Sequence, residues 1–143
     1  MKRLKKNERG AALLEAAITI PMILLVSVGI FEFGRAYQTW QVLTNAAREG
    51  ARVAVIDGST DAAVTQRVRD YMQAGSLPQY ATATVTINRA VALTGTDTAS
   101  QIDVDYPFDF MVLNPVVRLI APGDTTTGAP ITMRSSAIMR NEM

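Results

Sequence analysis

One carboxylate stands near the start of the most apolar stretch of the chain. Residues 11–31 hold a single charged side chain in 21 positions, and it belongs to Glu15. A carboxylate inside lipid costs several kcal/mol unless it is paired, so such residues are usually functional. If a protease cut between Gly10 and Ala11, the new terminal ammonium would lie four residues before Glu15. In a bundle of identical helices, that carboxylate and a neighbour's ammonium could neutralise each other.

A structural explanation of Glu15 is the alternative. Glu15 would then lie at the depth of the lipid headgroups near the start of a helix, where the helix dipole favours an acid.

Other groups able to do chemistry are few. The chain has no histidine and no cysteine, which excludes thiolate nucleophiles, histidine bases and the usual zinc ligands. Asp103, Asp105 and Asp109 offer the oxygen ligands that calcium prefers, but their spacing is not that of an EF-hand loop. We expect Asp103 and Asp105 on the solvent face of a strand, opposite Arg134. We therefore predict no catalytic, cofactor or metal site, and no enzyme.

Charge is distributed unevenly along the 143 residues, which suffice for one modest domain with an appendage. The net charge of +1 combines +4 in residues 1–10 with −3 in the remainder. The basic residues form a terminal cluster and not a domain face, so we expect no nucleic-acid partner.

Residues 11–31 have the length of a membrane-spanning helix, which needs about 20 apolar residues. The preceding basic residues predict a cytoplasmic N-terminus and an extracytoplasmic position for everything after Phe31. A secretory signal peptide would have a shorter apolar core of about 7–15 residues and an A-x-A cleavage site. No such site follows this segment, which favours an anchor that is retained.

The helical pattern continues beyond the span and predicts one helix over residues 11–56, with 32–56 outside the membrane. At 1.5 Å per residue such a helix is about 69 Å long. A seam of residues spaced three or four apart follows one side of it: Ala36, Trp40, Leu43, Ala47, Gly50 and Ala54. Its small residues allow close approach of another backbone. The seam can pack on this chain's own sheet, on neighbouring subunits, or on both.

Local features of this helix are also predictable. Pro21 predicts a local kink that a membrane helix tolerates. Glu32 with Arg35, and Glu49 with Arg52, have the i,i+3 spacing of helical ion pairs.

Residues 57–143 predict a small α+β domain. Ser59 or Thr60 can cap a helix over residues 61–74, and Gly75 is placed to end it. Three runs with alternating side chains predict antiparallel strands: residues 81–88, 101–108 and 131–140. The predicted fold class is therefore α+β: a long N-terminal transmembrane helix that continues into a small domain with an amphipathic helix and a three-stranded antiparallel sheet.

The connection between the last two predicted strands leaves two possibilities open. Residues 109–122 form either a short helix or an apolar loop. Residues 123–129, "GDTTTGA", predict an exposed turn.

The front of the chain resembles a known family. "ERG" followed by "AALLE" resembles a type IV prepilin leader: basic, ending in glycine, with glutamate fifth after it. The segments "EFGRAY" at 32–37 and "LTNAAREGAR" at 43–52 resemble the TadE-like family of the tight-adherence, or Flp-type, pilus. The resemblance covers roughly residues 8–56, and the tail "SSAIMRNEM" is more weakly similar. Ala16 differs from the aromatic residue that often follows this glutamate in such pilins.

The resemblance implies a prepilin-like minor pilin or pseudopilin, a structural component in pilus assembly and cell adhesion. It implies a leader at residues 1–10, cut at Gly10–Ala11, and a bacterial cytoplasmic (inner) membrane location before passage to the cell surface. The implied partners are a prepilin peptidase, other pilins and the inner-membrane pilus assembly platform. The alternative is a permanent, uncleaved bitopic membrane protein whose extracytoplasmic domain binds an envelope or surface partner.

Overall fold

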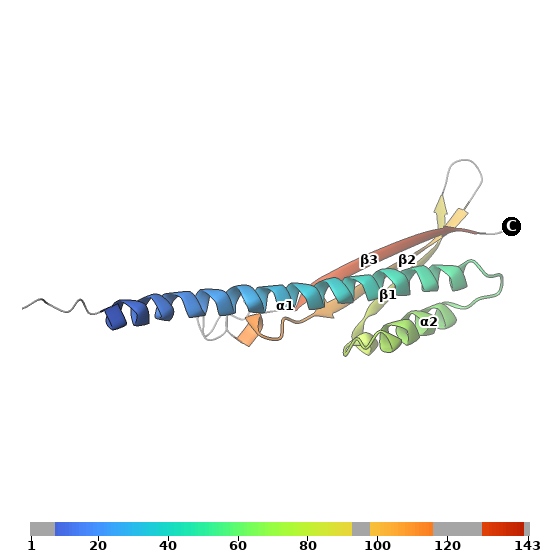
Figure 1. Ribbon diagram of the computed structural model, residues 1–143. Coiled ribbons are helices and arrows are strands. Elements are labelled where there is room, and N and C mark those ends of the chain that lie inside the picture. Colours follow the sequence, from blue (N-terminus) through green and yellow to red (C-terminus); the bar gives the residue numbers. More distant parts are fainter. Residues whose placement is uncertain (1–7, 93–97, 116–129, 142–143) are drawn as a thin grey trace, which may run out of the picture.

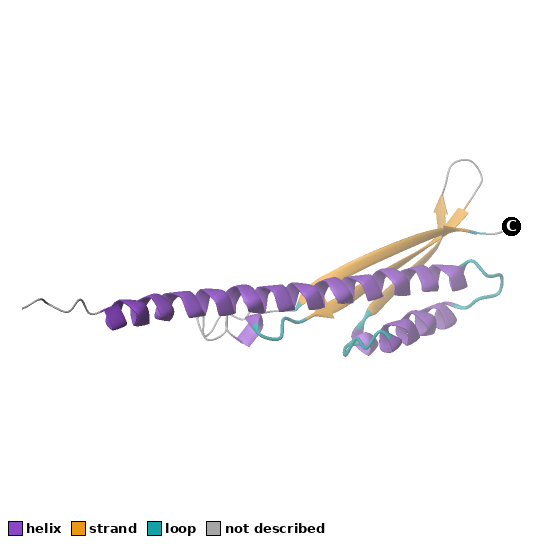
Figure 2. Cartoon of the chain, in the orientation of Figure 1, coloured by secondary structure: helices purple, strands orange, loops and turns teal. Residues whose placement is uncertain are grey.

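The computed structural model describes residues 8–92, 98–115 and 130–141 (Figure 1). The elements within these ranges are α1 (Glu8–Ala54), α2 (Asp61–Ala74), a short 3₁₀ turn η1 (Tyr80–Thr82), β1 (Thr84–Ala92), β2 (Thr98–Phe108) and β3 (Ile131–Arg140). The strands form one sheet, and the C-terminal half of α1 lies along it with α2 at its side (Figure 2). The expected α+β class, with its long helix and three-stranded antiparallel sheet, is confirmed.

Helix α1 is one element of 47 residues that continues through Pro21, and it is about 70 Å long at 1.5 Å per residue. It begins at Glu8, inside the segment expected to be a leader, so Gly10 and Ala11 are both helical. It ends at Ala54, two residues before the expected end. Its last carbonyl accepts a hydrogen bond from Arg89 Nη1 at 2.6 Å, and the chain turns there.

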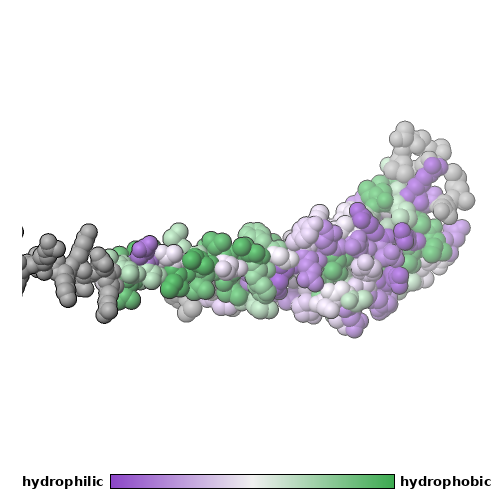
Figure 3. All heavy atoms as spheres, in the orientation of Figure 1, coloured by the Kyte–Doolittle hydropathy of each residue, from purple (hydrophilic) through white to green (hydrophobic). Residues whose placement is uncertain are grey.

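The two halves of α1 differ in what surrounds them. Residues 10–31 are almost wholly exposed, and the apolar stretch is long enough to cross a membrane with none of it buried by the described chain. Figure 3 shows this half as a hydrophobic rod extending from a more hydrophilic domain. From Glu32 onward, one side of α1 is buried against the sheet and α2.

The sheet has the order β1-β2-β3 with antiparallel neighbours. Ile102 in the central strand pairs with Ile87 on one side and Ala137 on the other, which fixes the inward face. Side chains alternate along β2, so its inward residues are buried: Ile102, Val104, Tyr106 and Phe108. The core therefore lies between β2 and the second half of α1, with α2 closing one side.

Helix α2 has the bounds that its end residues predict. Thr60 caps it by accepting a hydrogen bond from Ala63 N at 3.2 Å, and Gly75 follows its last residue. Its apolar side chains at i, i+4 and i+8 are fully buried: Val64, Val68 and Met72.

The strand predictions differ from the structure at their ends. The first strand begins at Thr84, three residues late, because Tyr80–Thr82 form the 3₁₀ turn; it continues to Ala92. The second begins three residues early at Thr98, and the third has the expected bounds. Residues 113–115 form a helical turn within the expected helix or loop, while residues 116–122 and the turn at 123–129 lie outside the described ranges.

Candidate membrane and assembly interface

The residues proposed for processing and charge pairing lie in the first turns of α1. Gly10, Ala11 and Glu15 are all exposed. Thr19 Oγ1 donates a hydrogen bond to the main-chain oxygen of Glu15 at 2.7 Å. This bond does not involve the Glu15 carboxylate. Within the described ranges the structure thus presents Glu15 on a bare apolar helix, available to a group from outside the chain.

Most of the predicted packing seam faces this chain's own domain. Leu43, Ala47 and Ala54 are buried in the core. At Gly50, the backbone approaches Val68 of α2 and Ile102 of β2. Ala36 is half-buried and packs against the edge of the core. The described contacts of these five residues are therefore intrachain.

Trp40 departs from that seam and is 46% exposed. Helix α2 ends beside Val42, since a β-carbon on Gly75 would meet Val42 Cγ1 at 2.5 Å. Val42 and Trp40 are two residues apart and therefore lie on different sides of the helix, so α2 packs on a side of α1 that Trp40 does not share. Trp40 contacts Tyr37, with ring centroids 6.3 Å apart.

An aromatic stripe that sequence reasoning missed includes this tryptophan. Phe33 is 71% exposed and Tyr37 is 63% exposed, and with Trp40 they have spacings of four and three residues. Residues so spaced lie on one side of a helix. The three-and-four spacing of aromatic residues within 31–40 is a signal in the sequence that could have predicted this arrangement. We call Phe33, Tyr37 and Trp40 the aromatic stripe.

Glu32 is the one fully buried acid among the described residues. Arg35 Nη1 donates to its Oε2 at 2.9 Å, which realises the predicted i,i+3 pair. The backbone N–H of Val112 donates to Oε1 from the segment after β2. The Arg35 guanidinium carbon lies 5.3 Å from the centroid of the Phe108 ring, a cation–π contact. This cluster joins the end of the sheet to the point where α1 leaves the domain.

The three aspartates considered for calcium have separate partners. Asp105 accepts two hydrogen bonds from Arg134, at 2.6 and 2.7 Å, directly across from it in the sheet. Asp103 accepts from Gln101, and Asp109 accepts from Gln79 Nε2 at 2.9 Å. The Arg134 hydrogen bonds hold the pKa of Asp105 below its ordinary value of 3.8. The expected pairing of this face with Arg134 is confirmed.

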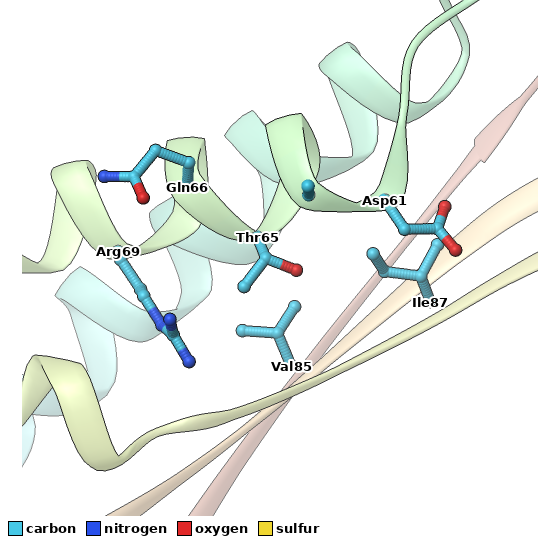
Figure 4. A pocket seen from close by; sticks show the side chains of 7 residues that line it. Asp61, Thr65, Gln66, Arg69, Val85 and Ile87 are labelled. Carbon is cyan, nitrogen blue, oxygen red and sulfur yellow. The ribbon is translucent and has the colours of Figure 1, made fainter.

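An open groove of about 490 Å³ lies between α2 and the edge strand β1 (Figure 4). Thr65 and Arg69 face Val85 and Ile87 across it. The Nε of Arg69 is buried and has no hydrogen-bond partner in the described chain. The groove presents the Arg69 guanidinium and the Asp61 carboxylate beside the apolar side chains of Val85 and Ile87.

A comparison with protein families gave a match within α1. The family model of the TadE-like protein matches residues 10–52, which are the apolar half of α1 and most of its packed half. No curated protein and no solved structure gave a match. The family resemblance seen in the sequence is thereby confirmed for this segment: residues 10–52 are similar to the TadE-like family, and α1 contains a candidate membrane span.

Proposed function

We propose that this chain is a minor pilin- or pseudopilin-like structural component in assembly of the tight-adherence pilus. One observation carries the proposal. The TadE-like segment is a single helix whose first half is apolar and bare, while its second half is fixed into a folded domain. A subunit of this shape can be held in a bilayer by the first half and can later pack that half against helices of other subunits.

The membrane stage of this function follows from the apolar half of α1. About 20 apolar residues cross the hydrocarbon, and the stretch after Gly10 provides them. The basic residues 1–10 orient the N-terminus to the cytoplasm. The sheet and α2 then lie on the extracytoplasmic side of the cytoplasmic (inner) membrane.

The assembly stage depends on Glu15. A prepilin peptidase would hydrolyse the Gly10–Ala11 peptide bond and remove the basic leader. The new Ala11 ammonium of one subunit would then neutralise the exposed Glu15 carboxylate of its neighbour in a helix bundle. The further partners proposed are other pilins and the inner-membrane assembly platform. The structure supports this proposal by presenting Glu15 outward among apolar side chains.

Processing is tested on the purified chain, expressed with and without a prepilin peptidase. We expect intact mass and N-terminal sequencing to give Ala11 as the first residue only when the peptidase is present. A functional form that begins at Met1 or Lys2 would overturn the processing step and favour the alternative, a permanent bitopic protein whose outer domain binds a surface partner.

Assembly is tested with Glu15→Ala against Asp57→Ala, which removes an exposed acid from the turn after α1. Sheared pili and membranes are probed for the chain and for the major pilin. We expect Glu15→Ala to reduce pilus yield and Asp57→Ala to leave it unchanged. Equal yields from Glu15→Ala and the unmodified chain would contradict the proposed charge pairing.

A further inference from the structure

We propose that the outer membrane boundary lies beside the turn of α1 that holds Glu32 and Arg35, and that the aromatic stripe crosses this boundary, with Phe33 at the edge of the hydrocarbon and Tyr37 and Trp40 in the lipid headgroup layer. The occupant of this face is therefore the bilayer surface. The inference rests on the membrane span proposed above and specifies how deeply the span and the domain are seated. It moves the outer boundary about 6 Å beyond Phe31, at 1.5 Å per residue over four residues.

The aromatic stripe continues the bare apolar surface of the span without a break. Ile30 and Phe31 are exposed, and Phe33, Tyr37 and Trp40 follow them along the helix. The Tyr37 hydroxyl accepts a hydrogen bond from Gln41 Nε2 at 2.8 Å, so its polar tip is engaged while its ring is exposed. Tyrosine and tryptophan are enriched where one end of a side chain meets lipid and the other meets water.

Of the two charges in the same region, the Glu32 side chain is fully buried and the Arg35 side chain is 29% exposed. Glu32 is enclosed by Arg35 and by the Val112 N–H, and Arg35 is in turn stacked on Phe108. A carboxylate at the edge of the hydrocarbon costs several kcal/mol unless it is paired in this way. Burial of the Glu32 carboxylate and stacking of the Arg35 guanidinium therefore fit a position at the edge of the lipid.

A second ion pair on the same helix gives an internal comparison. Glu49 and Arg52 have the same i,i+3 spacing, but their side chains are 26% and 68% exposed and their contact is 3.5 Å long. They lie farther along α1, about 26 Å beyond Glu32 at 1.5 Å per residue, where water can solvate them. Of these two i,i+3 pairs, only the one near the span has a fully buried carboxylate.

The dimensions of α1 fit this seating. The twenty residues 16–35 cover about 30 Å, the thickness of the hydrocarbon. Glu15 then lies at the inner headgroups, and Tyr37 and Trp40 lie about 3 and 8 Å beyond Arg35, within the outer headgroup layer. Met111 is exposed beside the Val112 that contacts Glu32, at the level of this boundary.

The chain offers its own reporter, because Trp40 is its single tryptophan. The full chain is reconstituted in phosphatidylethanolamine–phosphatidylglycerol vesicles that contain brominated phosphatidylcholine. We expect strong quenching of Trp40 emission when the bromines lie near the headgroup, weaker quenching when they lie near the chain end, and little quenching by aqueous iodide. Strong quenching by iodide with none by brominated lipid would overturn the proposal.

Single-cysteine variants provide a matched pair, because the chain has no cysteine of its own. Tyr37→Cys lies in the aromatic stripe, and Arg48→Cys is an exposed position farther along the same helix. With a polarity-sensitive thiol label, we expect a blue-shifted emission from Tyr37→Cys only. Efficient disulfide-linked dimers of Tyr37→Cys, with Trp40 shielded from both quenchers, would assign the face to a second copy and overturn a lipid contact.

Failure here is distinguishable from failure of the proposed function. Release of the chain from vesicles by alkaline carbonate would contradict the membrane span itself. A chain that carbonate leaves in the membrane, but whose Trp40 is open to iodide, contradicts only the proposed depth.

Discussion

Gly50 of α1 faces Val68 of α2 so closely that a β-carbon on Gly50 would lie 2.5 Å from Val68 Cγ2. The same β-carbon would lie 3.4 Å from Ile102 Cγ2 in the central strand. Gly50 is therefore the point at which both helices and the sheet converge. The small residue in the predicted seam permits this close packing within the chain.

Gly50→Ala should destabilise the domain by about 1–3 kcal/mol, because the added methyl group overpacks the core and the branched Val68 side chain has little rotamer freedom. Thermal unfolding of the full chain in mild detergent measures the effect. Gly34→Ala is the control, since no atom lies within 4 Å of a β-carbon there. It should be neutral or stabilising by up to about 1 kcal/mol through helix propensity. Equal effects at the two glycines would contradict the packing argument.

Arg89 connects the end of α1 to the start of α2. Its guanidinium donates to Ala54 O at 2.6 Å, to Ser59 O at 3.0 Å and to Asp61 Oδ1 at 2.8 Å. Arg89→Ala should lower the free energy of unfolding by about 1–2 kcal/mol, because it leaves these acceptors without a charged donor. Arg89→Lys should recover only part of the loss, since an ammonium lacks the planar fork. Denaturant unfolding of the detergent-solubilised chain gives both values.

Arg67→Ala is the matched control for Arg89. Arg67 forms one ion pair with Glu49 at 3.3 Å on the surface of α2. Exposed pairs of this kind contribute about 0–1 kcal/mol. A loss as large as that of Arg89→Ala would show that charge alone, and not the three-way contact, accounts for the effect.

The parts of the fold that the sequence predicted well are those set by local chemistry. Thr60 and Gly75 are a cap and a stop that act within one turn, and α2 has the bounds they predict. Alternation along β2 and β3 likewise determines which side chains face inward. The cross-strand contact of Asp105 with Arg134 followed from placing both on outward positions.

The parts that could not be predicted depend on residues far apart in the chain. Glu32 receives a hydrogen bond from Val112, 80 residues away, and no periodicity along α1 indicates that partner. The 46% exposure of Trp40 depends on which parts of the fold pack beside that turn of α1, and its spacing in the seam does not indicate this. The candidate interface could therefore be predicted only in part. Glu15 is apparent from the sequence because it is the one charge in an apolar stretch, whereas the burial of Glu32 is apparent only from the folded structure.

Glu32→Ala should destabilise the packed half of α1 by about 3 kcal/mol, the lower end of the range for a broken buried ion pair, because Arg35 keeps some access to solvent. Glu32→Gln should cost less, since an amide oxygen can still accept from Val112 N–H. The double variant Glu32→Ala/Arg35→Ala should be less destabilised than the sum of the single variants. Thermal unfolding of the four chains gives the coupling energy, and strict additivity would show that the pair is not coupled.

Asp105 and Arg134 should make stability depend on pH in the acid range. The hydrogen bonds from Arg134 lower the pKa of Asp105 in the folded chain below 3.8. A lowered carboxyl pKa contributes stability above the unfolded value, and this contribution is lost as the pH falls through the folded value. Melting temperatures are measured between about pH 7 and about pH 2, where Asp105→Asn should flatten the acid loss seen in the unmodified chain. Arg134→Gln removes the same pair from the other strand and should flatten it equally. An unchanged acid slope in Arg134→Gln would mean that this cross-strand contact is not the source of the pH dependence.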